Sequence, residues 1–434
     1  MNKIIAVLAA SALLSGGAEA RLSKKVRARA PPAKAAAAAP LATFAPNDPS
    51  LYYSPYQWQV SGSAASTINS AAYVRFLFSG TQLSFTFDVS NMCSSISEVY
   101  WRVDNGPATH SLVLPSVSVA IPPNNTLGDV PYHNVELFVK STTEGCNRWS
   151  ATGTSTRVIL TGIVTDGKLA QWFPSDANVL IYGDSITEGV LCLGGSQKLD
   201  TDHNDGSVVY SYSLARLLGA EIGVVGFGAT GLSRGGSGGV PALGVSWNQL
   251  WDGVPRSFSP KPDLILFSSY RPNSFRQPPA NLSPAHPIPK PGIIDHDLNT
   301  PNPHIFPADE GTNDGSNNIT AQMAVVLQNL IAACPGTPIV VMLPFNGAEA
   351  ASLQAAIAAV GSADVHYLDT TGFYDMSMYR PSRSRSTLHA SASLCAALAA
   401  VRSARCAAAA ATAAAVAQTK PASQKPPPPT HPRP

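Results

Sequence analysis

A serine lies where a catalytic nucleophile would be expected, between a predicted strand and a predicted helix. Residues 183–189 read Gly-Asp-Ser-Ile-Thr-Glu-Gly and follow the apolar run 178–182. Such a run indicates a buried parallel strand, and ligands bind at the carboxyl edge of open α/β sheets. Gly183 and Asp184 would support a tight turn that exposes the Ser185 hydroxyl among backbone N–H groups, as acyl transfer requires. A serine or aspartate here could also be only a helix cap.

Two further motifs could stabilise the negative charge that develops on a substrate oxygen. Residues 226–231 read Gly-Phe-Gly-Ala-Thr-Gly after the predicted strand 221–226, so a backbone N–H from Ala229 or Gly231 could point at an oxyanion beside Ser185. In Gly-Thr-Asn-Asp-Gly at 311–315, the side-chain amide of Asn313 could point at the same oxyanion. Each motif alone also has a plain interpretation, a glycine-rich loop and an Asn-Asp-Gly turn.

In this order the motifs resemble the three blocks of the SGNH (GDSL-type) hydrolases. Ser185 matches the first block, 228–231 the second and 311–314 the third. The sequences VRFLFSGTQLSFTF and VYWRVDNGP ahead of them make the chain resemble carbohydrate esterase family 2 more specifically, over roughly 47–375 and more weakly to about 400.

This resemblance implies a jelly-roll β-sandwich followed by a flavodoxin-like, doubly wound α/β domain. It also implies a serine esterase that removes acetyl groups from plant polysaccharides, with no metal or other cofactor. The expected oxyanion donors are the Ser185 N–H, the loop at Ala229 and Gly231, and the Asn313 side chain.

The resemblance also points to His389 as the general base. The family pattern has Asp-x-x-His near the carboxyl end, but here Ser386 takes the position of the acid, and the nearest upstream acid is Asp375. A neutral imidazole needs one nitrogen free to accept the proton of Ser185. We therefore expect a Ser185–His389 dyad in which a backbone carbonyl, or no group, orients the ring. His389 could also be an ordinary residue at a helix start.

The surrounding sequence predicts two domains. Apolar and polar residues alternate with period two around 83–87, 99–103, 135–139 and 158–163, which predicts a β-sandwich over 47–166. Strand and helix patterns then alternate over 174–405, which predicts a parallel sheet with helices on both faces. The expected strands are 178–183, 221–226, 263–267, 338–343 and 364–369, and the expected helices are 208–220, 318–333 and 349–360.

Other segments lack these periods. Residues 1–20 have the pattern of a secretory signal peptide, and the Ala/Pro-rich stretch 21–46 that of a linker. Residues 268–308 contain ten prolines and no periodicity, which predicts an insertion beside the site or misassigned sequence. Residues 406–434 form a low-complexity Ala/Pro tail. The sequons at Asn124, Asn281 and Asn318 would accept glycans on a secretory path.

Charge and cysteine content restrict the partners. The formal net charge is +2, yet residues 35–375 contain 14 Lys/Arg and 26 Asp/Glu, which argues against a nucleic-acid partner. No long apolar segment predicts a membrane span. The six cysteines include no CxxC pair, so a zinc site is not expected, and secretion would permit Cys93 and Cys146 to pair.

The sequence therefore predicts a secreted serine esterase acting on acetylated polysaccharide or oligosaccharide. The missing acid and the interruption at 268–308 leave open a carbohydrate-binding protein with a degenerate esterase domain. A lipase or thioesterase of the same superfamily is a second alternative, which acyl-chain preference would distinguish.

Overall fold

The computed structural model describes residues 40–94, 96–122, 132–193, 201–268, 314, 318–344 and 349–371. All of them belong to one compact unit that starts at Pro40. The predictions for the signal peptide, most of the linker, nearly all of the insertion and the carboxyl-terminal tail therefore lie outside the described residues.

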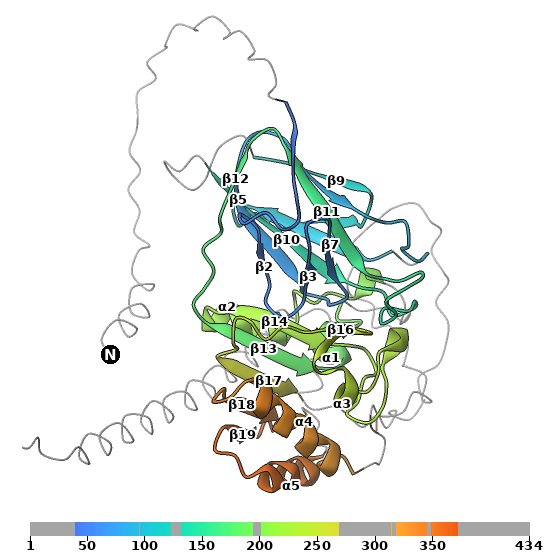
Figure 1. Cartoon of the computed structure of the whole chain (residues 1–434), viewed down its shortest axis with the longest axis vertical. Helices are drawn as coiled ribbons and strands as arrows, with labels where there is room; N and C mark the ends of the chain where they lie inside the picture. Colours follow the sequence, from blue (N-terminus) through green and yellow to red (C-terminus); the bar gives the residue numbers. More distant parts are fainter. Residues whose placement is uncertain are drawn as a thin grey trace, which may run out of the picture. The chain divides into compact units, whose positions relative to one another are not determined.

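Two antiparallel sheets form the first part of the fold (Figure 1). The first sheet has the order β3 (Gln59–Val60), β4 (Ala65–Thr67), β11 (Val158–Thr165), β6 (Leu83–Phe87) and β9 (Ser116–Val119), with β1 (Ala42–Phe44) also paired to β11. The second has the order β12 (Lys168–Ala170), β5 (Tyr73–Ser79), β10 (His133–Ser141), β7 (Glu98–Val103) and β8 (Thr109–Leu112), with β2 (Tyr52–Tyr53) also paired to β5. We call residues 40–170 the sandwich.

The sandwich has one apolar core to which both sheets contribute alternate residues. In β6 the apolar side chains at 83, 85 and 87 are buried and the polar ones between them are half-buried, as the period-two pattern predicts. Phe76 and Phe85 meet edge to face across the two sheets, with ring centroids 6.3 Å apart. In β11 the pairing register with β6 shifts between Leu160 and Gly162. Because of this irregularity, the buried apolar side chain after Leu160 is Ile163 instead of the residue two positions on.

Five parallel strands form the second part of the fold. Their order is β14 (Glu221–Gly226), β13 (Asn178–Gly183), β17 (Leu264–Ser268), β18 (Ile339–Met342) and β19 (Val365–Leu368). These are the five strands expected from the sequence, and the predicted mixture of antiparallel and parallel sheets is confirmed. Ser268, the first residue of the predicted insertion, is the last residue of β17.

Helices cover both faces of the parallel sheet. The helices are α1 (Ser185–Glu188), α2 (Tyr210–Leu218), α3 (Leu243–Ser246), α4 (Thr320–Ala333) and α5 (Ala350–Val360). Helices α4 and α5 lie side by side and pack on Leu180, Ile265 and Val341 (Figure 1). Residues from the intervening positions of the strands pack with α2 on the opposite face. Because both faces are covered, the strands are apolar at nearly every position.

The central strands β5 and β10 of the second antiparallel sheet are largely buried on both faces. One face contributes to the sandwich core, and on the other Tyr73 and Phe138 pack with Tyr212 of α2 and with Ile222 of β14. The Tyr73 hydroxyl also hydrogen-bonds the Glu221 carboxylate at the start of β14. The sandwich therefore covers the edge of the parallel sheet directly.

The disulfide between Cys93 and Cys146 confirms the pairing that the sequence allowed. It joins the segment before β7 to the loop that follows β10, residues 142–149. Cys192 and Cys334 are free thiols, and Cys334 is buried behind α4.

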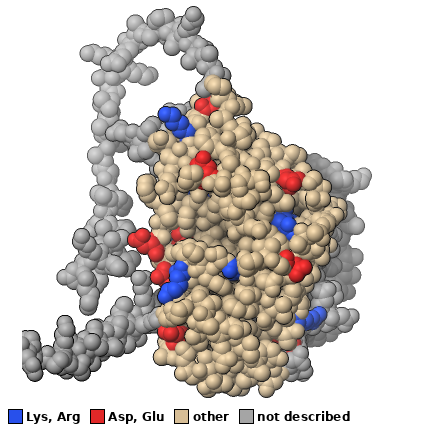
Figure 2. Space-filling view, viewed as in Figure 1, with Lys and Arg blue, Asp and Glu red and all other residues tan. Residues whose placement is uncertain are grey.

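Few charged residues lie on the face of the molecule in Figure 2, and both signs occur there among a majority of uncharged side chains. Within the described segments, no helix is long and apolar enough to cross a membrane.

We expect the double variant Cys93→Ser/Cys146→Ser to lower the free energy of unfolding. The cross-link spans 53 residues, and closing a loop of this size in the unfolded chain is worth about 2–4 kcal/mol. Urea unfolding followed by circular dichroism measures the change. Cys192→Ser is the matched control, and a loss in that variant as large as in the double variant would contradict the assignment.

A second polar cluster joins the sandwich to the loop before α2. The buried Glu98 carboxylate accepts hydrogen bonds from the Lys140 ammonium at 2.5 Å and the Thr201 hydroxyl at 3.1 Å, and its Oε2 lies 2.7 Å from His110 Nε2. Burial alone would raise the pKa of Glu98, but Lys140 and the other hydrogen-bond partners lower it below its usual value. This carboxylate therefore stabilises the fold when ionised, above about pH 4.5, and that contribution is lost as the pH falls through its lowered pKa.

Replacing Lys140 with Met should therefore destabilise the protein most near neutral pH. The substitution leaves a buried carboxylate without its cation, which typically costs about 3–5 kcal/mol. The cost should shrink between pH 5 and 3, because protonation of Glu98 removes the unpaired charge. Thermal unfolding across this pH range tests the trend, with the exposed Lys168→Met as control. A loss independent of pH would contradict the assignment.

Candidate functional site

The structure places Ser185 at the carboxyl end of β13, on the turn that the sequence predicted. Strand β13 ends at Gly183, Asp184 has extended backbone angles, and Ser185 is the first residue of α1. The Asp184 carboxylate accepts the Ile186 N–H at 2.9 Å, so Asp184, rather than Ser185, caps the helix. Ser185 is half-buried, and its own N–H is among the first N–H groups of α1, which have no partner within the helix.

Close packing beneath the turn explains why position 183 is glycine. A Cβ there would lie less than 3.0 Å from the Thr187 side chain. Thr187 is fully buried and its hydroxyl hydrogen-bonds Tyr210 of α2 at 2.8 Å. Burial raises the pKa of Tyr210 to about 12, so this phenol stays protonated and keeps its hydrogen bond at physiological pH. The turn at Ser185 is therefore supported from below by side chains with little freedom to move.

The loop after β14 runs beside this turn. The Gly228 N–H donates to the Glu188 carboxylate of α1 at 2.7 Å, which joins the loop to the helix that begins with Ser185. Ala229 has a positive φ of 59° and is half-buried. The Gly231 N–H already donates to the Arg234 carbonyl at 2.9 Å. Of the two donors expected in this loop, the Gly231 N–H is therefore already engaged, and the role of the Ala229 N–H stays a prediction.

The described part of the third motif also contacts this loop. The buried Asp314 carboxylate accepts the N–H groups of Leu232 and Ser233 at 2.9 and 2.7 Å and the Ser233 hydroxyl at 2.8 Å. Asp314 thus supports the loop that contains Ala229. Asn313, His389, Ser386 and Asp375 lie outside the described residues, so their roles stay predictions.

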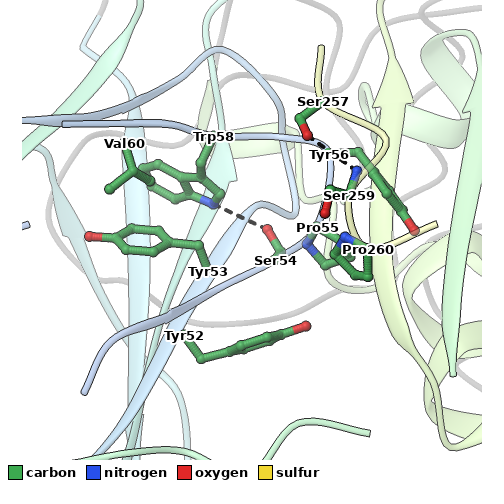
Figure 3. Close-up of a pocket in the computed structure, with 10 residues that line it drawn as sticks. All are labelled: Tyr52, Tyr53, Ser54, Pro55, Tyr56, Trp58, Val60, Ser257, Ser259 and Pro260. Atoms are coloured by element: carbon green, nitrogen blue, oxygen red, sulfur yellow. Dashed lines mark hydrogen bonds between the residues drawn. The ribbon is translucent and has the colours of Figure 1, made fainter. Parts of the chain in front are cut away.

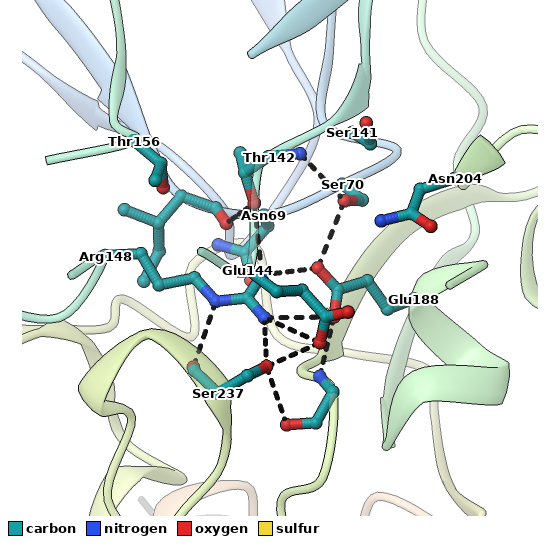
Figure 4. A network of polar contacts seen from close by, with 12 residues as sticks. Asn69, Ser70, Ser141, Thr142, Glu144, Arg148, Thr156, Glu188, Asn204 and Ser237 are labelled. Atoms are coloured by element: carbon teal, nitrogen blue, oxygen red, sulfur yellow. Dashed lines mark hydrogen bonds and ion pairs between the residues drawn. The ribbon is translucent and has the colours of Figure 1, made fainter. Parts of the chain in front are cut away.

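A buried charge network beside the turn was not predicted from the sequence (Figure 4). Arg148, fully buried in the loop after β10, forms an ion pair with Glu188 through both terminal nitrogens, the second at 3.3 Å. Its guanidinium also donates to the Ser237 hydroxyl at 3.0 Å and the Thr142 hydroxyl at 3.2 Å, and lies 3.6 Å from Glu144. Arginine is rarely buried unless it is paired. The sequence around Arg148 therefore gave no reason to expect this side chain in the interior.

The described residues contain no group of three or more His, Cys, Asp or Glu side chains arranged to hold a metal ion. By residue type, Trp247 and Trp251 could line a sugar-binding cleft or pack internally; in the structure Trp251 is buried and Trp247 is half-buried. Trp251 belongs to the core under α4, and Trp247 stacks on Phe258 with ring centroids 5.8 Å apart.

A small aromatic pocket lies elsewhere (Figure 3). Its volume is about 170 Å³, and Tyr52, Tyr53, Tyr56 and Trp58 line it together with Ser257, Ser259 and Pro260. Residues 257–260 precede β17, so the pocket lies toward the amino end of that strand. Ser185 follows the carboxyl end of β13, which runs parallel to β17. This pocket is therefore not part of the predicted site.

Known proteins were compared with the chain in three ways. No protein-family model matches it, and no curated protein sequence matches it. Among solved structures, a family two carbohydrate esterase from Cellvibrio japonicus has a TM-score of 0.60 at 18% identity, covering 83% of this chain and 97% of that one.

Two further solved structures are similar. An acetyl xylan esterase from the rumen bacterium Butyrivibrio proteoclasticus has a TM-score of 0.58 at 15% identity, covering 82% of this chain and 98% of that one. A family two carbohydrate esterase from Clostridium thermocellum, in complex with cellohexaose, has a TM-score of 0.55 at 15% identity, covering 80% of this chain and 98% of that one. The chain therefore has the fold of the family 2 carbohydrate esterases, which is an SGNH hydrolase fold, as the sequence motifs predicted.

Gly183→Ala should disrupt the turn. The added Cβ meets a buried threonine side chain that is held by Tyr210, so the turn must shift, at a cost of about 1–3 kcal/mol. Any hydrolytic activity that depends on Ser185 should fall with it. Thermal unfolding and ester hydrolysis measure the two effects, with Gly62→Ala as the control because its Cβ would meet only ordinary contacts. Unchanged activity in Gly183→Ala would mean that ester hydrolysis does not depend on the conformation of this turn.

Proposed function

We propose that this protein is a secreted serine esterase of the SGNH class, acting on O-acetyl groups of polysaccharide or oligosaccharide. The observation that carries the proposal is the position of Ser185. It follows the carboxyl end of a central parallel strand, begins a helix, and lies next to the loop of Ala229, in the fold of family 2 carbohydrate esterases.

In the proposed reaction the Ser185 hydroxyl attacks the ester carbonyl. His389 accepts its proton and donates it to the leaving sugar oxygen as the ester C–O bond breaks; water, deprotonated by His389, then attacks the acetyl-enzyme, and the proton returns to Ser185 as acetate leaves. The N–H groups of Ser185 and Ala229 and the side chain of Asn313 stabilise the oxyanion, and each such donor is typically worth ~10²–10³ in kcat. With Ser386 in place of an acid, His389 works as half of a dyad, oriented by a backbone carbonyl or by no group.

The finer features of the fold belong to the same proposal. The strand order β14-β13-β17-β18-β19 supports a flavodoxin-like doubly wound sheet. In such a sheet ligands bind where the strand order reverses, which here would be between β13 and β17. Ser185 follows β13, at this point. We interpret the two antiparallel sheets as the jelly-roll of the family 2 esterases, and residues 1–20 as the signal peptide that directs secretion.

The choice of a carbohydrate ester rests on the similar proteins. One is described as an acetyl xylan esterase and another was solved with cellohexaose. A carbohydrate-binding protein with a degenerate esterase domain remains the second candidate, because Ser386 stands where the acid is expected. Binding to acetylated xylan without release of acetate would favour that alternative.

The Ser185→Ala variant should lose hydrolysis of p-nitrophenyl acetate by ~10³-fold or more relative to the wild type, because the covalent step loses its nucleophile. Ser84→Ala, in β6 of the sandwich, is the control that should keep full activity. Equal rates for wild type and Ser185→Ala would remove Ser185 from the mechanism. Rates that rise from acetate to octanoate esters would instead indicate a lipase or thioesterase.

A further inference from the structure

The position of Glu188 connects the nucleophile to the oxyanion loop. Glu188 is the last residue of α1, three residues after Ser185, and its carboxylate is buried. One oxygen accepts the Gly228 N–H at 2.7 Å, and both oxygens accept from Arg148. A single side chain of the helix that begins with Ser185 therefore contacts both the loop before Ala229 and the sandwich.

The direction of the Ala229 N–H is determined on the other side of the same loop. The Gly228 carbonyl and the Ala229 N–H belong to one peptide plane, and in a trans peptide they point in opposite directions. The Ser237 N–H donates to the Gly228 carbonyl at 2.8 Å, and the Ser237 hydroxyl lies 3.0 Å from the same oxygen. Fixing this carbonyl therefore aims the Ala229 N–H.

The sandwich supplies the groups that orient Ser237. Its hydroxyl lies 2.5 Å from Glu144 Oε1 and accepts a hydrogen bond from Arg148 Nη2 at 3.0 Å. Arg148 also donates through Nε to the Ser237 carbonyl at 3.3 Å, and its backbone N–H donates to the Gly238 carbonyl at 2.8 Å. Figure 4 shows Glu144, Arg148 and Ser237 pointing toward one another. Glu144 and Arg148 thus fix Ser237, and Ser237 in turn fixes the Gly228 carbonyl.

This support matters because the backbone of the loop is strained at Ala229. Ala229 has a left-handed backbone conformation, which a residue with a Cβ adopts only when its surroundings impose it. Gly228 packs so closely on Glu144 that a Cβ at position 228 would overlap the carboxylate. The loop conformation therefore depends on contacts made by the sandwich.

We propose that Glu188 and Arg148 are positioning residues for the esterase reaction: through Gly228 and Ser237 they set the distance and direction of the Ala229 N–H relative to Ser185. The inference rests on the proposed function, because it assigns the Ala229 N–H to the oxyanion. It makes the sandwich part of the catalytic apparatus through the loop that it supports.

Glu188→Ala should lower kcat for p-nitrophenyl acetate by about 10–10²-fold, with KM changed less than twofold, because a displaced donor weakens the transition state more than the bound substrate. Glu188→Gln keeps an acceptor for the Gly228 N–H and should recover most of kcat. Rates are expressed per active site, counted by titration with a fluorophosphonate that labels Ser185.

Glu221 provides the matched control. It is a buried carboxylate that also joins the sandwich to the parallel sheet, with Arg75 Nη1 at 2.9 Å, but it lies at the amino end of β14, opposite to the Ala229 loop. Glu221→Ala should lower the melting temperature as Glu188→Ala does and leave kcat per active site unchanged. Equal kcat for the Glu188→Ala and Glu221→Ala variants would reduce the Arg148 network to a structural role and overturn the proposal.

A replacement variant and a hydrogen-exchange measurement cover the cases in which Glu188→Ala does not fold or the wild-type protein hydrolyses no ester. If Glu188→Ala does not fold, the variant Arg148→Met/Glu188→Gln, which removes both buried charges together, replaces it and should show the same fall in kcat. If wild-type protein hydrolyses no ester, the proposed function fails, and hydrogen exchange tests the positioning alone. Backbone amides of 226–232 should exchange at least tenfold faster in Glu188→Ala than in Glu221→Ala, and equal exchange would overturn the inference.

Discussion

The buried guanidinium of Arg148 is the constraint on which the arrangement of this protein depends. A fully buried cation is tolerated only when carboxylates and hydrogen-bond acceptors surround it, because its desolvation costs several kcal/mol. Here the partners come from two parts of the chain: Thr142 and Glu144 lie in the same loop, whereas Glu188 and Ser237 flank the candidate site. Separating the sandwich from the parallel sheet would leave these charges unpaired.

The same interface is continued by apolar packing and by two further polar clusters. The outer face of β5 and β10 packs on α2 and β14, the Glu98–Lys140 pair contacts Thr201 in the loop before α2, and Arg75 pairs with Glu221 of β14. The sandwich therefore cannot be regarded as an accessory module joined by a linker. It provides one wall of the structure that supports Ser185.

The candidate site follows a general rule of parallel sheets, in which reactive groups gather at the carboxyl ends of adjacent strands. Ser185 follows β13 and Ala229 follows β14, so two neighbouring strands place the proposed nucleophile and one oxyanion donor side by side. The positive φ of Ala229 shows that this loop carries local strain. Its N–H groups donate hydrogen bonds to the carboxylates of Asp314 and Glu188, and the Ser237 N–H donates to its Gly228 carbonyl, so the loop is held in place.

Much of this architecture could be predicted from local sequence. The change from period two to alternating strands and helices predicted both kinds of sheet, and all five parallel strands lie within a residue or two of their expected bounds. The turn at Ser185 was predictable because a glycine, an acid and a serine after an apolar run satisfy local requirements of strand end and helix cap. The Cys93–Cys146 pair was among the pairings that the sequence allowed.

Only the tertiary structure decided which residues support the site. Arg148 and Glu188 are 40 residues apart in the sequence, and no local pattern tells that an arginine in a loop will be buried against a distant carboxylate. The same holds for Gly231, whose N–H is engaged by Arg234, and for Trp251, which packs in the core. Periodicity reports the faces of an element, whereas the pairing of polar groups between elements depends on how the elements pack, and this is determined by the whole fold.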